Sequence, residues 1–423
     1  MKKILLIILA VLIVFIILIY WSLNSTPDTY KTSTIVNLEN VDSINFKDYD
    51  SLTIAASTLY EANAIKKLMQ GEHYRKAWAT PIEVPIAFLD TLKGGLELIK
   101  EGGGNQTKSL KFKDSIGNKY TLRSINKNPA PLIPEFAKTL GLENIIVDGI
   151  SAQHPYAAPV VAILAEAAGI LHTDPKLYFV PKQAALKEFN DTYGNKLFLF
   201  EHETESDKNW TPIKNVSTII ETDDLQLRKL ERGDQLKIDE PALVRARLFD
   251  LLIGDWDRHA KQWGWVIQEI ANGEKAIPLP ADRDNAFFSI SGVIPNIISN
   301  KNVTPEVRPF KDDISYMPGL VHDFDTYFLK EVPETVFVEQ AQKLQELMTD
   351  QIIENALKQW PKAIYDLDGK EIISKLKSRR DELINYAKAF KAVLNDKDYP
   401  TKPLKGSDDL DLQGHYLKCF ECY

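Results

Sequence analysis

Residues 254–288 read "GDWDRHAKQWGWVIQEIANGEKAIPLPADRDNAFF", and this stretch decides how we expect the chain to fold. Two strand-forming runs, "QWGWVIQEI" and "KAIPLPA", flank Asn272-Gly273, a dipeptide that is typical of a two-residue type I′ turn. With the turn at these two residues, Gln262 is expected opposite Arg283 across the hairpin. The stretch therefore predicts an antiparallel hairpin whose open end carries two polar loops.

The open end of this hairpin concentrates oxygen-bearing side chains. Asp257 lies in the loop that enters the first strand, and Asp282 and Asp284 lie in the segment that leaves the second strand. A rigid scaffold commonly presents functional groups on such loops. Together with the amide oxygen of Gln262, these carboxylates form an all-oxygen ligand set that suits Mg²⁺ or Mn²⁺ better than zinc. The sequence thus predicts a hard-cation site here, and such cations commonly bind together with phosphates.

Other residues in and before the stretch have simpler expected roles. The segment "DEPALVRARLFDLLIG" predicts a helix with Asp239 as its N-cap and Gly254 as its C-cap. Asp250 and Asp255 are expected to shape the loop by local hydrogen bonds. The two tryptophans of "WGW" alternate along a strand and are expected in the core.

A glycine-rich segment earlier in the chain supplies a second candidate for phosphate contact. Residues 96–125, "LELIKEGGGNQTKSLKFKDSIGNKYTLRSI", predict three antiparallel strands with a glycine loop between the first two. Glycines let backbone N–H groups approach phosphate oxygens, although this run matches neither of the common nucleotide-binding glycine patterns. In the hairpin stretch, Arg258 and His259 either contact phosphate or form a salt bridge that fixes the loop. The loop residues expected to face phosphates are Gly102, Gly103, Gly104 and Gln106.

The N-terminus carries a segment typical of a membrane anchor. Lys2 and Lys3 precede an apolar run over residues 4–23, which is long enough to cross a bilayer as a helix. The run is longer than that of a cleaved signal peptide, and no cleavage site follows it. By the positive-inside rule, the N-terminus is expected in the cytoplasm and the bulk of the chain outside it.

Composition narrows the function classes. The chain has 423 residues, and its hydrophobic content of 44% is that of a packed globular protein. A net charge of -8 gives no basic footprint, so no nucleic-acid partner is expected. Cys419 and Cys422 form a CxxC at the C-terminus, where an exposed tail or a late disulfide is a simpler interpretation than a redox or metal site. The chain lacks the G-x-S-x-G motif of a serine hydrolase and the paired histidines of a metallohydrolase.

The segments "DLLIGDWDRHAKQWGWV" and "IPLPADRDNAFF" resemble the catalytic and metal-binding segments of the atypical protein-kinase-like fold. This group includes the HipA-like and CotH-like kinases, the type II phosphatidylinositol 4-kinases and the secretory-pathway casein kinases, and "GGGNQTKSL" is also similar to segments of uncharacterised bacterial membrane-anchored members. The resemblance implies an α+β fold with two lobes, in which the N-lobe has an antiparallel sheet and the C-lobe is mainly helical. The expected divisions are a transmembrane anchor (1–24), a linker with a short helix (25–80), an N-lobe (81–205), a C-lobe with the catalytic and metal-binding loops (206–395) and a tail (396–423).

The resemblance also implies roles for the residues at the open end of the hairpin. Asp257 matches the catalytic aspartate that orients or deprotonates an acceptor hydroxyl. Gln262 stands where many relatives have a metal-binding asparagine. Asp284 matches the metal-binding aspartate, and Asp282 is the competing choice for this role.

In the N-lobe, Arg123 stands where a lysine that binds the α and β phosphates is expected, and Lys127 is a nearby substitute. Arginine keeps the charge but differs in geometry. Residues 200–203 are expected as a hinge beside adenine. For the carboxylate that partners the phosphate-binding cation, three candidates stay open: Glu143, Asp148 and Glu166.

These observations lead to a principal and an alternative hypothesis. The principal hypothesis is a membrane-anchored kinase-like protein that binds ATP with Mg²⁺ or Mn²⁺ and transfers a phosphoryl group to an unidentified hydroxyl on a protein, lipid, sugar or small molecule. Because little ATP is present outside a bacterial cytoplasm, the alternative is a catalytically silent binding module of the cell envelope.

Overall fold

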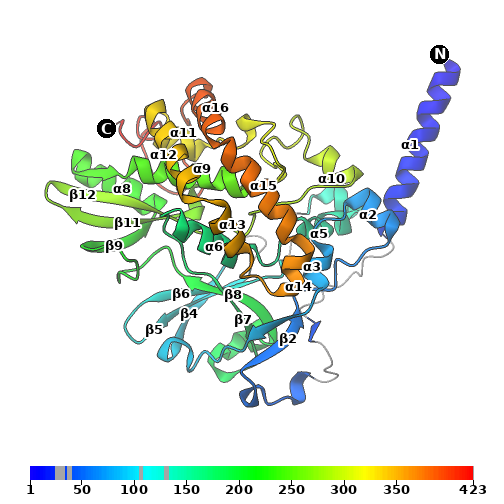
Figure 1. Ribbon diagram of the computed structural model, residues 1–423, viewed down its shortest axis with the longest axis horizontal. Helices are drawn as coiled ribbons and strands as arrows, with labels where there is room; N and C mark the ends of the chain where they lie inside the picture. The colour runs from blue at the N-terminus through cyan, green and yellow to red at the C-terminus, as the bar shows by residue number, and fades with distance from the viewer. Residues whose placement is uncertain (24–33, 36–40, 104–107, 128–132, 423) are drawn as a thin grey trace.

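The computed structural model describes residues 1–23, 34–35, 41–103, 108–127 and 133–422, and it has two lobes with separate sheets (Figure 1). The first lobe contains a five-stranded antiparallel sheet in the order β4-β5-β6-β8-β7. The second is mainly helical around a four-stranded sheet in the order β10-β12-β11-β9. This architecture confirms the predicted α+β class, with an antiparallel sheet in the first lobe and a helical second lobe.

The strands of the five-stranded sheet are β4 (Leu96–Gly102), β5 (Ser109–Asp114), β6 (Lys119–Ser124), β7 (Lys176–Val180) and β8 (Lys196–His202). The first three form the predicted meander, because β4 pairs with β5 and β5 with β6. Their apolar face packs into a core cluster of its own, which includes Leu110, Phe112 and Leu122. A small sheet of β1 (Thr34–Ile35), β2 (Ser51–Ala55) and β3 (Ile82–Pro85) lies beside it.

The second lobe is built around the buried helix α9 (Glu240–Ile253). The strands of its sheet are β9 (Val216–Glu221), β10 (Leu236–Ile238), β11 (Trp263–Ile270) and β12 (Gly273–Pro280). The α-helices of the described residues are α1 (Lys2–Leu23), α2 (Ala64–Gln70), α3 (Arg75–Ala79), α4 (Glu135–Thr139), α5 (Glu143–Asp148), α6 (Ala157–Ala167), α7 (Asn190–Tyr193), α8 (Thr222–Arg232), α9 (Glu240–Ile253), α10 (Val293–Ile298), α11 (Asp323–Leu329), α12 (Glu334–Leu347), α13 (Asp350–Leu357), α14 (Lys362–Ile364), α15 (Lys370–Asp381) and α16 (Leu383–Asp396). In Figure 1, α12, α15 and α16 lie over α9.

Helix α9 begins and ends where the sequence predicts. The side chain of Asp239 accepts a hydrogen bond from the backbone N–H of Ala242 at 3.1 Å, as an N-cap does. Gly254 ends the helix with φ 70°, and a Cβ at this position would lie 2.6 Å from the ring of Phe310. A glycine is therefore required both by the left-handed backbone and by the close ring.

The hairpin is present, but its predicted register is wrong. Trp263 pairs with Pro280 and Ile270 with Gly273, so the turn is at residues 271–272. Gln262 consequently lies opposite Ala281, whose N–H donates to the Gln262 carbonyl at 3.0 Å, instead of opposite Arg283. Gly273 is the first residue of β12, and a glycine is required there because a Cβ would lie only 2.2 Å from the Gln235 carbonyl oxygen, beside β10.

The segment expected to be a linker packs into the body from residue 41 onward. Strand β2 pairs with β3, and buried side chains such as Ile54, Tyr60 and Trp78 join the main core. The predicted short helix accounts for only part of this packing, since much of the burial comes from a strand and loops. The tail also packs, because Leu404 and Phe420 are buried and Cys419 forms a disulfide with Cys422.

Asp250 on α9 is the centre of a buried charge cluster. It lies within 2.9 Å of Arg247, 3.2 Å of Arg258 and 2.9 Å of Arg283, and Asp325 on α11 pairs with Arg247 at 2.6 Å. Burial opposes ionisation of Asp250, but the surrounding guanidinium groups outweigh it and lower its pKa. The cluster joins α9, the loop before β11 and the segment after β12, and it confirms the structural role expected of Asp250.

We expect Asp250→Asn to lower the free energy of unfolding by about 3–5 kcal/mol, because it leaves buried arginines without their counter-charge. Urea unfolding in detergent micelles measures this loss. The matched control is Asp350→Asn, which removes a carboxylate that pairs with Lys377 and Arg380 on the surface. Exposed ion pairs add little to stability, so equal losses in the two variants would contradict a structural role for the buried cluster.

Candidate functional site

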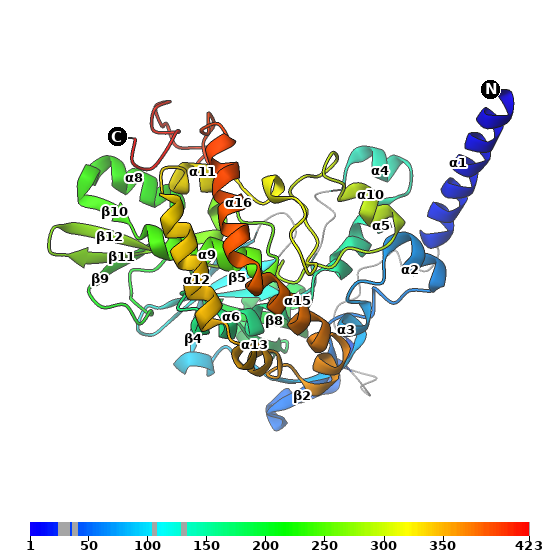
Figure 2. The ribbon, with the colours of Figure 1, turned by 45° about the horizontal axis from the view of Figure 1, so that its top comes forward.

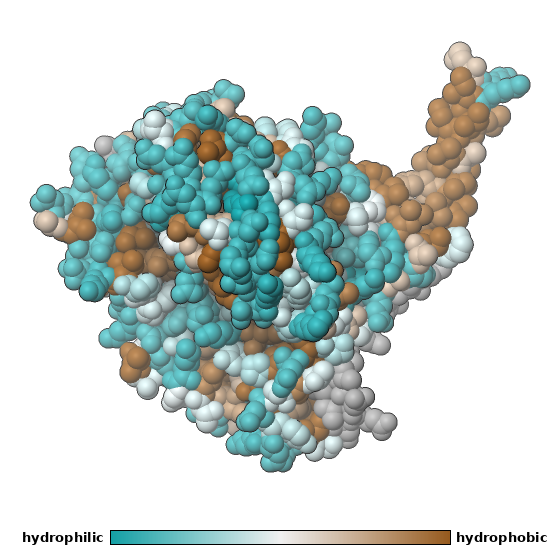
Figure 3. Space-filling view, viewed as in Figure 1, coloured by the Kyte–Doolittle hydropathy of each residue, from teal (hydrophilic) through white to brown (hydrophobic). Residues whose placement is uncertain are grey.

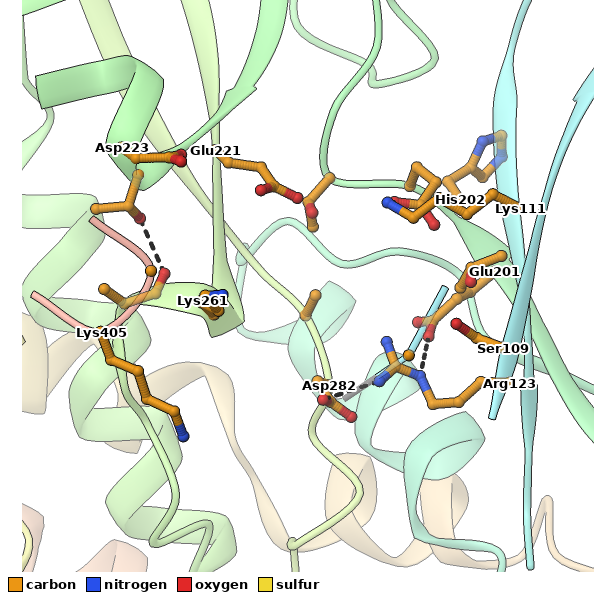
Figure 4. A pocket seen from close by; sticks show the side chains of 18 of the residues that line it. Ser109, Lys111, Arg123, Glu201, His202, Glu221, Asp223, Lys261, Asp282 and Lys405 are labelled. Carbon is orange, nitrogen blue, oxygen red and sulfur yellow. Dashed lines mark hydrogen bonds and ion pairs between the residues drawn. The ribbon is translucent and has the colours of Figure 1, made fainter. Parts of the chain in front are cut away.

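A cavity of about 360 Å³ lies between the five-stranded sheet and the hairpin lobe (Figure 4). Its volume is in the range of small-molecule sites. Residues of β5, β6 and β8 line one side, and the start of α8, the residues around Ala260, the segment after β12 and part of the tail line the other. The charged side chains that line it are Lys111, Arg123, Glu201, Glu203, Glu221, Asp223, Lys261, Asp282 and Lys405.

Arg123 on β6 connects the two sides of this cavity. Its Nε lies 3.2 Å from Glu201 Oε1 on β8, and its Nη1 lies 2.9 Å from Asp282 Oδ2 after β12 (Figure 4). Burial opposes the charge of Arg123, yet Asp282 and Glu201 raise its pKa. Burial raises the pKa of Glu201, and Arg123 and the hydroxyl of Thr173 offset part of that shift. The predicted phosphate-binding cation therefore faces the cavity and is held by one carboxylate from each lobe.

Asp282 and Asp284 lie on the hairpin side, where each meets a cation from the first lobe. Lys127 Nζ lies 2.6 Å from Asp284 Oδ2. Burial and the negative charge of Asp282 raise the pKa of Asp284, and Lys127 offsets only part of this. For Asp282, burial is outweighed by Arg123 and Lys127, which lower its pKa. Asp282 has φ 54°, and its buried Oδ1 has no hydrogen-bond partner among the described residues.

Asp257 lies on the loop between α9 and β11, and its side chain is 34% exposed. Its backbone N–H donates to Asp255 Oδ1 at 3.3 Å, and its Oδ1 lies 3.8 Å from His259 Nε2. Burial raises the pKa of Asp255, and Asp250, Asp257 and Asp284 add to the shift, although Arg258 opposes it. The carboxylates of Asp257 and Asp284 thus both act on the charge of Asp255.

Arg258 and Gln262 fix the loop. Arg258 is fully buried and donates to Gln262 Oε1 at 3.0 Å and to the Ala281 carbonyl at 2.7 Å. Of the two interpretations left open for Arg258, the salt bridge that shapes the loop is the observed one. The amide oxygen of Gln262 is engaged by Arg258, so a role for Gln262 as a metal ligand stays a prediction. Trp263 and Trp265 are buried, as predicted, and Trp263 stacks on Phe324.

The glycine loop reaches the cavity at its described edge. Gly102 pairs with Ser109, and Gly103, with φ 111°, lines the cavity beside Ser109. Gly104 and Gln106 lie outside the described residues. The predicted hinge residues 201–203 also line the cavity, where β8 ends and the chain leaves for β9.

The partner of Arg123 is Glu201, which none of the three helix candidates anticipated. Asp148 is buried and pairs with Lys66 at 2.9 Å and with Arg75, so it stabilises the packing of α2 and α3. The sequence marks Glu201 only as the single carboxylate near the end of the apolar strand "KLFLFEH". Lys405 was also missed, because only the folded chain brings the tail to the cavity. Lys261, in the loop directly before β11, was missed as well.

The residues that the structure describes here offer cations for a phosphate and carboxylates for a metal ion, but not a complete set of metal ligands. Asp282 and Asp284 supply oxygens, including the unpartnered Oδ1 of Asp282, and Arg123 and Lys127 supply positive charge beside them. Lys405 lines the same cavity as Arg123 and Asp282. The described residues contain no group of three acidic, histidine or cysteine side chains arranged to hold a metal by themselves. The arrangement therefore fits a cation that shares its coordination with a phosphate or water.

Comparison with known proteins places the chain near two solved structures. It is similar to the proinflammatory kinase CtkA of Helicobacter pylori, at 13% identity over 70% of this chain and 96% of that chain, with a TM-score of 0.38. It is also similar to a chain of the toxin–antitoxin complex of HipA, HipB and operator DNA from Shewanella oneidensis MR-1. The identity is 10% over 79% of this chain and 78% of that chain, and the TM-score is 0.27. Both neighbours have the atypical protein-kinase-like fold that the sequence resembles. At these scores neither neighbour bears on function. No protein-family model and no curated protein matches the chain.

His259, a half-buried histidine of the loop, predicts a pH dependence of stability. Burial, with Lys405 and Arg258 nearby, lowers the pKa of His259 to about 4. Between its ordinary value near 6.5 and about 4, the unfolded chain binds a proton that the folded chain does not. Stability is therefore lost as the pH falls through this window, by roughly 1.4 kcal/mol for each unit of the pKa difference.

We expect His259→Gln to reduce the loss of unfolding free energy between pH 6.5 and pH 4, relative to the unchanged chain. Denaturant unfolding at a series of pH values measures this difference. His415→Gln serves as the control because His415 is exposed on the tail. Parallel pH profiles for His259→Gln and the unchanged chain would exclude a His259 that stays neutral in the folded protein.

Proposed function

We propose that this protein is a membrane-anchored kinase-like enzyme that binds ATP with Mg²⁺ or Mn²⁺ in the cavity between its lobes. In the proposed reaction, a phosphoryl group moves to a hydroxyl of an unidentified acceptor. The observation that carries the proposal is the ion pair of Arg123 with Glu201 and Asp282, since it sets a phosphate-binding cation against metal-binding carboxylates across one cavity.

Charge around the cavity supports binding of a metal-bound polyphosphate. Arg123 and Lys127 are suited to phosphate oxygens, and Asp282 and Asp284 are suited to the divalent cation. In the free protein these groups neutralise one another, because Arg123 pairs with Asp282 at 2.9 Å and Lys127 pairs with Asp284 at 2.6 Å. A ligand that carries both phosphates and a cation offers each of the four groups a partner of opposite charge, whereas a simple anion or cation serves only two. The proposal therefore requires metal and nucleotide to bind together.

Asp257 is the proposed residue for the acceptor. Its side chain is more exposed than those of Asp282 and Asp284, and it lies on the loop that leads into β11. In the proposed step, the acceptor oxygen forms the new bond to phosphorus, the bond to the leaving ADP breaks, and the hydroxyl proton moves to Asp257. The divalent cation, when bound, would neutralise charge on the phosphates.

The proposed location is the extracytoplasmic side of a membrane, with the N-terminus inside. Helix α1 has 22 residues and is long and apolar enough to cross a bilayer. The disulfide between Cys419 and Cys422 supports an oxidising compartment for the body. In that compartment, the enzyme would need ATP supplied from elsewhere.

We expect Asp284→Ala to abolish binding of ATP in the presence of Mn²⁺, because it removes a metal ligand while it leaves Lys127 free to attract phosphate. Isothermal titration calorimetry of the detergent-solubilised protein measures the binding with and without Mn²⁺. The matched control is Asp191→Ala, whose carboxylate is 96% exposed. Unchanged Mn²⁺-dependent binding in Asp284→Ala would overturn the site assignment.

We expect Asp257→Asn to lower the rate of phosphoryl transfer by about 10²–10⁴-fold and to leave the affinity for ATP with Mn²⁺ unchanged, because the amide cannot accept a proton. Release of ADP in the presence of candidate hydroxyl acceptors measures the rate, and Asp191→Asn is the control. A chain that binds ATP with Mn²⁺ but releases no ADP with any acceptor would favour the silent binding module over the enzyme.

A further inference from the structure

The C-terminal end of α1 is fixed to the body by two hydrogen bonds. Tyr20 Oη donates to the Leu140 carbonyl at 3.0 Å, and Gln70 Nε2 of α2 donates to Ser22 Oγ at 2.8 Å. Ser22 and Gln70 are both buried. Helix α1 therefore leaves the body in a defined direction, as Figures 1 and 2 show, while its remaining length is almost entirely exposed.

Three body elements border this end of α1. The residue that receives the Tyr20 hydrogen bond directly follows α4, and α2 contacts α1. Helix α10 packs against α2, because the N–H of Glu72 donates to Ser291 Oγ at 3.0 Å and a Cβ on Gly292 would lie 2.3 Å from the Gly71 nitrogen. In Figure 2, α4 and α10 lie beside the lower part of α1.

Exposed apolar side chains gather on these bordering elements. After α1, the described residues include fifteen large hydrophobic side chains that are exposed, and seven of them lie on α2, α4, α10 or the residues just after α4 and α10. Figure 3 shows apolar surface on the body next to the base of α1. We call this set the apolar collar: Leu68, Phe136, Leu140, Val293, Ile297, Ile298 and Val303.

We propose that the apolar collar inserts into the interfacial layer of the bilayer that α1 crosses. The argument rests on continuity, because the collar begins where the apolar surface of α1 ends and the two are fixed to each other by hydrogen bonds. Side chains as exposed as Phe136 (65%) and Ile297 (52%) are removed from water only if something covers them, and a bilayer around α1 already reaches their position. Contact through both a helix and the collar would fix the orientation of the body on the membrane.

This inference rests on the anchor in the proposed function, so the experiment separates the two. Single cysteines are introduced into the full chain at Leu12 in α1, at Ile297 in the collar and at Ile116. Ile116 is the matched control because it is an exposed isoleucine, 70% accessible, in the β5–β6 turn of the far lobe. Each is spin-labelled after reconstitution into phosphatidylcholine vesicles, and the unchanged chain, whose two cysteines form a disulfide, reports background labelling.

Electron paramagnetic resonance then compares collisions with oxygen, which concentrates in lipid, and with a water-soluble nickel chelate. We expect labels at Leu12 and Ile297 to be protected from the chelate at least about tenfold relative to Ile116. Equal chelate access at Ile297 and Ile116, with Leu12 protected, would overturn the collar proposal and retain the anchor. Chelate access at Leu12 would overturn both. Spin–spin broadening at Ile297 that persists at high lipid-to-protein ratio would instead assign the collar to contact with a second copy of the chain.

Discussion

The buried carboxylate of Asp250 is the constraint on which the geometry of the second lobe depends. A carboxylate without exposure to water requires counter-charge, and three arginines from different segments supply it: one from α9 itself, one from the loop before β11 and one from the segment after β12. The cluster therefore fixes both chain segments at the open end of the hairpin relative to α9. Arg283 is the important member, since its side chain is directed to Asp250 while its neighbours Asp282 and Asp284 contact the first lobe. Because Arg283 is held by the buried cluster, the carboxylates of Asp282 and Asp284 on either side of it face the first lobe.

The contact between the lobes is electrostatic at the cavity. Arg123 and Lys127 come from β6 and the residues after it, and their carboxylate partners come from the segment after β12. These pairs are less buried than the Asp250 cluster, since Asp282 and Asp284 keep side-chain exposures of 26% and 18%. Partly exposed pairs can exchange partners at moderate cost, whereas fully buried ones cannot. The chain therefore uses buried ion pairs to hold the scaffold and partly exposed ones at the proposed site.

The sequence allowed a substantial part of this arrangement to be predicted, and the failures have physical causes. Local patterns identified α9 with its two caps, the strands of the hairpin and the meander, because capping, alternation and turn residues act over a few positions. The register was wrong because Asn272-Gly273 has the composition of a turn, while Gly273 is needed for the close approach of Gln235. Glu201 and Lys405 could not be predicted, since their proximity to Arg123 or to the cavity depends on pairing of distant segments. The packing of residues 41–80 was missed for the same reason.

The tail shows how the last residues of the chain complete the cavity. Ser407, which lines the cavity, donates from its hydroxyl to Gln226 Oε1 on α8 at 2.6 Å, and both residues are buried. Further along, Lys229 on α8 lies 3.1 Å from Glu421, and the ring of Phe420 packs against Phe328. Glu421 lies between the two cysteines of the disulfide, so that covalent ring holds the residue that meets α8. The tail is therefore fixed to α8 at two points, Ser407 and Glu421, and this keeps Lys405 at the wall of the cavity, where its positive charge adds to the attraction for an anionic ligand.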